Sequence, residues 1–499
     1  MNTRVARPFH RRCAAASILG WACLSAGASA DAMEVVGQQA IPGIFAKALP
    51  PPPASHQDAE FFVQGQARLY KSQGAWRSDG VWAVVPTSTA SYATRLLVRT
   101  PRDPAQFNGT VMVEWLNSTF GFDVGVDGSY GQEALSKGFA WVGVSTSVKD
   151  ALPGLLTQGF TDMTAFTGPA RYTAIDAAWS GPSWNRNTDY SYDIYTQAAQ
   201  LLRAQPAIVL NGLRPQRLVA VGQSRSSMRL VTYANAIQPL TQAFDGFLIH
   251  GRPPNAQPIA LNVLELLSTP FVSRIRTDLS AKVLQLQTEQ DTVNSLGVLA
   301  RQPDSPTMRT WEVTGASHFD SHITGMLTAL AQQSSHPQDR LLVVCDKPLN
   351  DLPFHRVEKA AWVAMHQWLS SGKAPGSAQP IEYRADGGSR RNLLTGHAEG
   401  GLRLPEITAP TRHYSTANQG DSGATNQQVP SYNSTACNIG GASKPLAAWQ
   451  LAWLYNSPAD YLAQFKAATQ AAVAQGFLLP EDGEQALAEA EARAQAWAP

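Results

Sequence analysis

Short apolar runs alternate with segments of helical periodicity along most of the chain. Eight runs are rich in β-branched, aromatic and other apolar residues, at 60–70, 94–100, 110–116, 139–145, 217–222, 244–250, 282–288 and 308–314. From the third onward they are almost continuously hydrophobic, as expected of parallel strands that are covered on both faces. Helical patterns lie between and after them, at about 129–138, 190–206, 226–238, 259–268 and 357–371. This alternation predicts an α/β fold with an open, mostly parallel sheet of eight strands flanked by helices.

The composition indicates a folded protein of considerable size. Apolar residues make up 44% of the 499 residues and charged residues only 15%, which excludes disorder for most of the chain. Lys and Arg number 39 against 38 Asp and Glu, a formal net charge of +1. Because there is no basic excess to bind a phosphate backbone, we expect no nucleic acid partner. The sequence indicates no particular oligomeric state.

Residues 1–30 have the features of a secretory signal peptide. They contain several arginines and no acidic residue, then an apolar run from Cys13 to about Leu24, and then small residues that end at Ala30. A short membrane anchor is the alternative, but a spanning helix needs about 20 apolar residues, and no segment is apolar for so long. We therefore expect cleavage near Ala30 and a secreted or periplasmic protein without a stable membrane span.

The rest of the chain divides into three parts. Residues 31–58 form a Pro-rich lead-in, 59–371 hold the α/β core, and 372–499 are a C-terminal extension packed on that core, with helical patterns near 457–475 and 481–497. Two insertions, 146–189 and 251–280, follow core strands. Insertions at the carboxyl ends of strands commonly cover a functional site.

Two cysteines remain after removal of the signal peptide. Cys13 and Cys23 leave with it, and Cys345 and Cys437 stay in the mature chain. In an oxidising compartment such a pair is expected to form a disulfide that ties the C-terminal part to the core. Two separate buried thiols are the alternative. Neither cysteine has the spacing of a redox or metal motif.

The segment 217–236 combines a buried strand, a tight Gly-x-Ser turn and a helix. This is the context of a nucleophile elbow, in which a serine occupies a strained turn between strand and helix. The serine is Ser224, and the small residues that must flank it are Gly222 and Ser226. The backbone N–H of Arg225, at the start of the helix, is then the first donor of an oxyanion hole. An ordinary strand-to-helix turn is the alternative.

A serine nucleophile needs a base and an orienting acid, here expected in the order Ser, acid, His at the ends of strands. Asp291 and Glu289 follow the 282–288 strand, and His318 follows the 308–314 strand. His318 would take the Ser224 proton, and Asp291 would hold the imidazole in the correct tautomer. Glu289, with its longer side chain, is the alternative acid.

The second oxyanion donor is expected in the loop after the 110–116 strand, at Asn117 or Ser118. Glu114 lies within that strand, where a buried carboxylate needs partners, so it is expected to anchor the loop by hydrogen bonds. His318 and His322 form an H-x-x-x-H pair, but the Glu of a zinc HExxH motif is absent. We predict no metal and no organic cofactor.

Six motifs resemble the α/β-hydrolase superfamily and, within it, the bacterial family described as "α/β hydrolase domain", many of whose members are exported. They lie at 113–119, 222–227, 286–292, 301–318, 344–354 and 400–407. The resemblance covers most of 60–410 and implies an eight-stranded hydrolase core with a triad of Ser224, His318 and either Asp291 or Glu289. The segment 58–67 only loosely follows the family's acidic-aromatic opening.

These observations predict a secreted serine hydrolase that cleaves a small-molecule carboxylic ester through an acyl-enzyme. Aromatic residues of the first insertion are candidates for an acyl pocket, although packing is the commoner role of such residues: Phe160, Phe166, Tyr172, Trp179 and Trp184. The same triad is compatible with cleavage of an amide, lactone or thioester. A hydrolase-like binding protein without catalysis is the alternative from another class.

Overall fold

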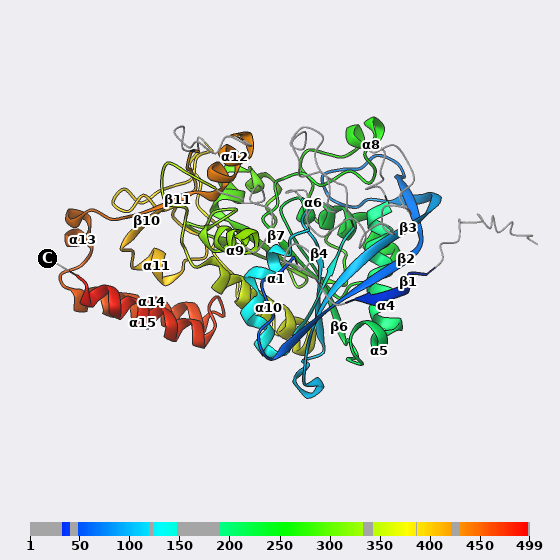
Figure 1. Cartoon of the computed structure of the whole chain (residues 1–499). Helices are drawn as coiled ribbons and strands as arrows, with labels where there is room; N and C mark the ends of the chain where they lie inside the picture. Colours follow the sequence, from blue (N-terminus) through cyan, green and yellow to red (C-terminus); the bar gives the residue numbers. More distant parts are fainter. Residues whose placement is uncertain are drawn as a thin grey trace, which may run out of the picture.

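A nine-stranded sheet forms the centre of the molecule (Figure 1). The structure is a computed structural model, and it describes residues 32–39, 48–118, 123–146, 190–332, 343–385, 387–420 and 430–497. The predicted signal peptide and the five aromatic residues of the first insertion lie outside these ranges. No helix in the described part of the chain has the length and apolarity needed to cross a membrane.

All eight predicted runs form strands of this sheet, and the strand order is β1-β2-β3-β5-β4-β6-β7-β8-β9. The pairs β1–β2, β2–β3 and β3–β5 are antiparallel. The pairs β5–β4, β4–β6, β6–β7, β7–β8 and β8–β9 are parallel. The sheet has one strand more than expected, because β1 lies in the region interpreted as a lead-in. The bounds are β1 (Glu34–Gln39), β2 (His56–Ser72), β3 (Val84–Pro101), β4 (Thr110–Trp115), β5 (Ala140–Val144), β6 (Arg217–Gln223), β7 (Gly246–His250), β8 (Lys282–Thr288) and β9 (Met308–Val313).

Both faces of the parallel strands are covered by helices. Along β6, Leu218 and Ala220 join one apolar cluster, and Val219 and Val221 join the other, as the two-residue period of a strand requires. The helices α4 (Ser191–Ala204) and α6 (Arg225–Thr232) pack on the first face. The second face is covered by three helices, α1 (Val126–Tyr130), α9 (Ser321–Gln332) and α10 (Phe354–Ser371). Two-sided burial explains why these strands are hydrophobic throughout.

The chain after α10 extends the sheet and adds a helical pair. Leu402 lies beside the edge strand β9: its N–H donates to Glu312 O at 2.7 Å, and Thr314 N–H donates to Leu402 O at 3.0 Å. The Trp311 indole donates to Gly376 O at 2.7 Å. Farther on, α14 (Pro458–Ala474) and α15 (Pro480–Gln495) pack on each other around a small cluster of their own. The insertion 251–280 contains a single helix, α8 (Val263–Ser268).

The expected disulfide between Cys345 and Cys437 is present, with 5.6 Å between the two Cα atoms. The two residues are 92 positions apart, and Cys437 belongs to α12 (Pro430–Gly440). Its sulfur is buried against the chain that follows α9. The bond therefore fixes the extension covalently to the core.

Candidate active site

Ser224 occupies a strained turn between β6 and α6. Its φ and ψ are 61° and −121°, a region that residues with a side chain rarely adopt. The approach of strand and helix is close, because a Cβ at Gly222 would lie 2.9 Å from the Cβ of Ser226. The Ser224 N–H donates to His250 O at 3.0 Å, which ties the turn to the end of β7. The local geometry is that of the nucleophile elbow predicted from the sequence.

His318 and Asp291 are brought together from the turns after β9 and β8. His318 Nδ1 donates to Asp291 Oδ1 at 2.5 Å. The other oxygen, Asp291 Oδ2, accepts from Thr288 Oγ1 at 2.6 Å and from Thr288 N at 3.2 Å. A Cβ at Gly251 would lie 3.1 Å from Asp291 Oδ2 and 3.3 Å from His318 Nδ1, so this pair packs directly against the β7 end.

Glu289, the alternative acid, has other partners. Its Oε2 accepts from Gly315 N at 2.8 Å, and its Oε1 accepts from Arg391 Nη2 at 2.8 Å. Both contacts hold the turn after β9 and the extension in place. Of the two carboxylates, Asp291 is therefore the one that contacts His318.

Burial and charge oppose each other in the His318–Asp291 pair. Burial favours the neutral form of Asp291, but the His318 charge and the hydrogen bonds from His318 and Thr288 outweigh it and hold its pKa below the ordinary value. Burial likewise lowers the pKa of His318, but the Asp291 charge and hydrogen bond raise it above the ordinary value. The pair thus stabilises a protonated His318 next to an ionised Asp291.

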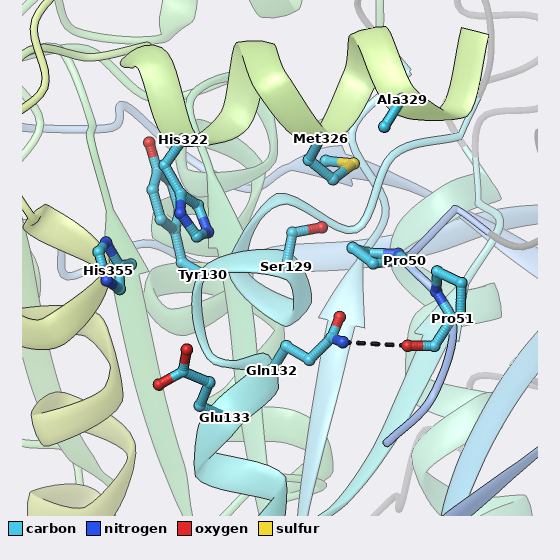
Figure 2. A pocket seen from close by; sticks show the side chains of 10 residues that line it. All are labelled: Pro50, Pro51, Ser129, Tyr130, Gln132, Glu133, His322, Met326, Ala329 and His355. Atoms are coloured by element: carbon cyan, nitrogen blue, oxygen red, sulfur yellow. Dashed lines mark hydrogen bonds between the residues drawn. The ribbon is translucent and has the colours of Figure 1, made fainter. Parts of the chain in front are cut away.

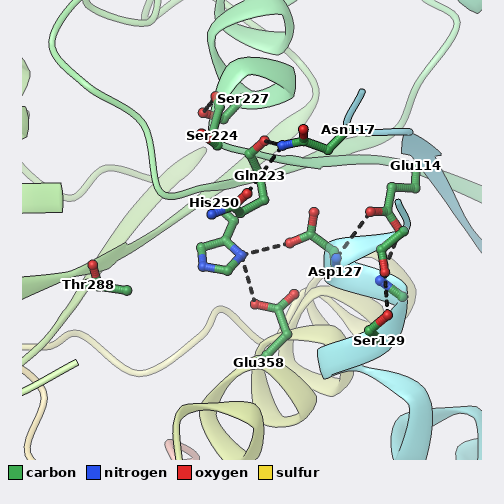
Figure 3. A network of polar contacts seen from close by, with 12 residues as sticks. Glu114, Asn117, Asp127, Ser129, Gln223, Ser224, Ser227, His250, Thr288 and Glu358 are labelled. Carbon is green, nitrogen blue, oxygen red and sulfur yellow. Dashed lines mark hydrogen bonds and ion pairs between the residues drawn. The ribbon is translucent and has the colours of Figure 1, made fainter. Parts of the chain in front are cut away.

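Gln223, which sequence reasoning missed, contacts the second nitrogen of His318. Its Nε2 donates to His318 Nε2 at 3.0 Å and to His318 O at 3.2 Å. Asn117 Nδ2 in turn donates to Gln223 O at 3.2 Å (Figure 3). Within the described residues, no hydrogen bond joins the Ser224 hydroxyl to His318. Gln223 directly precedes Ser224, so the contact between Gln223 and His318 places the imidazole beside the serine turn.

Arg225, Asn117 and Ser118 were expected to supply the oxyanion donors, and their positions and contacts differ. The backbone N–H of Asn117, one of the two residues expected to supply the second donor, donates to Val124 O at 2.9 Å. The chain turns back after β4, and this turn pairs Asn117 with Val124. The composition and the residue spacing of the sequence do not predict such a turn. Ser118, the other residue expected to supply this donor, follows directly. Arg225 is the first residue of α6, as expected, so its N–H lies at the N-terminal end of that helix.

Glu114 has the anchoring contacts predicted for it. Its carboxylate accepts from Asp127 N at 3.1 Å, Gly128 N at 2.9 Å and Trp141 Nε1 at 2.8 Å. It therefore fixes the beginning of α1 beneath the loop that follows β4. Asp123, earlier in that loop, forms a buried ion pair with Arg95 at 2.8 Å.

A second polar cluster lies near the Ser224 turn, and no pattern in the sequence predicts it. Asp127 of α1, His250 of β7 and Glu358 of α10 are fully buried and point toward one another (Figure 3). His250 Nδ1 lies 2.8 Å from Asp127 Oδ1 and 3.7 Å from Glu358 Oε2. Three separate elements contribute one residue each, so no local motif marks the group.

A pocket of about 320 Å³ opens between α1, α9 and α10 (Figure 2). It is lined by Pro50, Pro51, Ser129, Tyr130, Gln132, Glu133, His322, Met326, Ala329 and His355. His322 stacks on His355 with ring centroids 4.5 Å apart. Burial lowers the pKa of His355 to about 3, and this ring is neutral.

The order of the strands and the elbow turn define an α/β hydrolase. A family model described as "Alpha/beta hydrolase domain" matches residues 34–488, and the chain belongs to this family. No curated protein matches the chain.

Among solved structures, a proposed dienelactone hydrolase from Klebsiella pneumoniae is 14% identical, with a TM-score of 0.30 over 62% of this chain and 99% of its own. A glucuronoyl esterase from Teredinibacter turnerae is 10% identical, with a TM-score of 0.25 over 57% and 73%. A serine hydrolase without a lid from Xanthomonas campestris is 12% identical, with a TM-score of 0.24 over 53% and 86%.

Proposed function

We propose that this chain is a serine hydrolase that cleaves carboxylic esters of small molecules through an acyl-enzyme. The main support is the 2.5 Å hydrogen bond between His318 and Asp291, close to a serine held in a strained strand-to-helix turn. An imidazole oriented by a buried carboxylate is the group that activates a serine hydroxyl. The disulfide supports a second part of the proposal, export to an oxidising compartment after cleavage near Ala30.

In the proposed reaction, Ser224 Oγ attacks the ester carbonyl carbon while His318 Nε2 takes the hydroxyl proton. The bond to the alcohol breaks, and His318 returns the proton to the leaving alcohol. Water then attacks the acyl-serine ester, again losing its proton to His318, and the acid leaves as Ser224 regains a proton. Asp291 stays ionised throughout and stabilises the imidazolium.

Two neighbouring groups complete the proposed site. The negative charge on the carbonyl oxygen would be held by the N–H groups of Arg225 and Ser118. Gln223 must release His318 Nε2 before the serine hydroxyl can donate to it, because that nitrogen accepts only one proton at a time. Displacement of the Gln223 amide by bound substrate would therefore accompany activation of the nucleophile.

The test is the Ser224→Ala variant of the mature chain. We expect it to lose hydrolysis of p-nitrophenyl acetate and covalent labelling by a fluorophosphonate, since both need the hydroxyl. Ser136→Ala is the matched control, because Ser136 is exposed on a distant helical turn. Full turnover by Ser224→Ala would refute the proposal. A wild-type chain that is folded but neither labelled nor active would indicate a binding protein.

A further inference from the structure

The buried cluster of Asp127, His250 and Glu358 has more negative charge than its surroundings neutralise. Glu114 lies next to it through the N–H of Asp127, so three carboxylates and one imidazole share a dry region. In the described part of the chain, no Lys or Arg pairs with any of them. The cations nearest along α10 are used elsewhere: Lys359 contacts Glu133 and Asp482, and Arg356 contacts Glu406 and Glu489.

Several atoms of the cluster have no hydrogen-bond partner among the described residues. They are Asp127 Oδ2, Glu358 Oε2 and His250 Nε2, and all are inaccessible to solvent. A buried polar atom without a partner destabilises the folded state, and it does so more strongly when it is charged. Glu358 Oε2 is directed at His250 Nδ1 from 3.7 Å, beyond hydrogen-bond range (Figure 3).

His250 is within hydrogen-bond distance of only one of these two carboxylates, Asp127 and Glu358. Its Nδ1 lies 2.8 Å from Asp127 Oδ1, and Glu358 Oε2 has no hydrogen-bond partner among the described residues.

A metal cation fits the spacing and the donor types. Two atoms that each lie about 2.1 Å from a zinc ion at tetrahedral angles are about 3.4 Å apart. The separations from His250 Nδ1, 2.8 Å and 3.7 Å, lie on either side of that value, and the three ligand atoms all fall within 4.8 Å of one another. One imidazole and two carboxylates are ligands of zinc and manganese.

We propose that Asp127, His250 and Glu358 bind one divalent cation, zinc or manganese, beneath the Ser224 turn. The cation joins α1, α10 and the end of β7, and His250 O at that end accepts the Ser224 N–H. Its role is to hold these elements, and so the turn, in position.

The first test needs no variant. The mature chain, without a histidine tag, is purified from medium supplemented with zinc and manganese, and its metal content is measured by mass spectrometry. We expect about one ion per chain, a melting temperature that falls by several degrees after chelation, and recovery on adding zinc or manganese. Fewer than about 0.1 ion per chain, with no thermal shift on adding either metal, would overturn the proposal.

Variants then assign the ligands. Glu358→Gln keeps the shape but removes a charge, and we expect its metal content to fall at least tenfold. Glu406→Gln, which changes another buried carboxylate, serves as the control and should keep the metal. Ser224→Ala should also keep the metal, so the metal content tests the proposed metal site independently of the proposed esterase activity. Retention of the metal by Glu358→Gln would refute this set of ligands.

Discussion

Replacing Asp291 by Asn is the most direct test of the proposed role of the contact between Asp291 and His318. The change keeps the size of the side chain but removes the charge that accepts from His318 Nδ1 at 2.5 Å. Without this charge, the imidazolium that forms in the transition state is left buried without its counter-charge, a loss of about 3–5 kcal/mol of transition-state stabilisation. About 1.4 kcal/mol is a factor of ten in rate, so kcat/KM should fall by about 10²- to 10⁴-fold. An Asn amide can also donate to Nδ1 and favour the wrong tautomer, which acts in the same direction.

The assay is the initial rate of p-nitrophenyl ester hydrolysis, with circular dichroism to verify folding. Glu289→Gln is the matched control, because it changes a buried carboxylate in the same turn that contacts Gly315 and Arg391 instead of His318. We expect this variant to lose stability but to retain a kcat/KM near that of the wild type. The reasoning is refuted if Asp291→Asn retains normal activity, or if Glu289→Gln loses as much activity as Asp291→Asn.

Three further outcomes are expected. Thr288→Val removes the hydroxyl that donates to Asp291 at 2.6 Å, so kcat/KM should fall about 10- to 100-fold, and an unchanged rate would contradict that role. Because the pKa of His318 is raised and the base must be neutral, activity should be lost as pH falls through a midpoint above about 6.5; a pH profile with a midpoint below 6 would contradict this sign. Replacing Cys345 and Cys437 by Ser should lower the free energy of unfolding by about 2–5 kcal/mol in denaturant titrations, whereas an unchanged midpoint would show that the bond adds nothing.

Local patterns were sufficient to predict the sheet and the order of the candidate site residues. A strand covered on both faces is hydrophobic throughout, so the runs from 110–116 onward appear in the sequence as they do in the fold. Ser224, Asp291 and His318 each follow such a strand, and the carboxyl ends of parallel strands meet at one edge. The strand β1 was missed because it is short, exposed in part and next to prolines.

Contacts between distant segments were not predictable in this way. The choice between Asp291 and Glu289 depends on Arg391, which lies about a hundred residues later and takes the longer side chain away. The Gln223 contact with His318 and the pairing of Asn117 with Val124 depend on how the chain turns after each strand. His250, Asp127 and Glu358 come together only through packing of three elements.

Leu402, which pairs with the edge strand β9, is made late in synthesis, and this affects how the core folds while the chain is being made. An edge strand with unsatisfied amides and carbonyls is a template for association with other chains. In the described part of the chain, the backbone of β9 is covered along Glu312–Thr314 by Leu402, a residue made long after it. During synthesis, the core would therefore leave the ribosome or the secretion channel with the edge of β9 unpaired. This edge would be able to associate with other chains until residue 402 has been made. Shortening the gene after α10 should yield aggregates rather than a smaller enzyme.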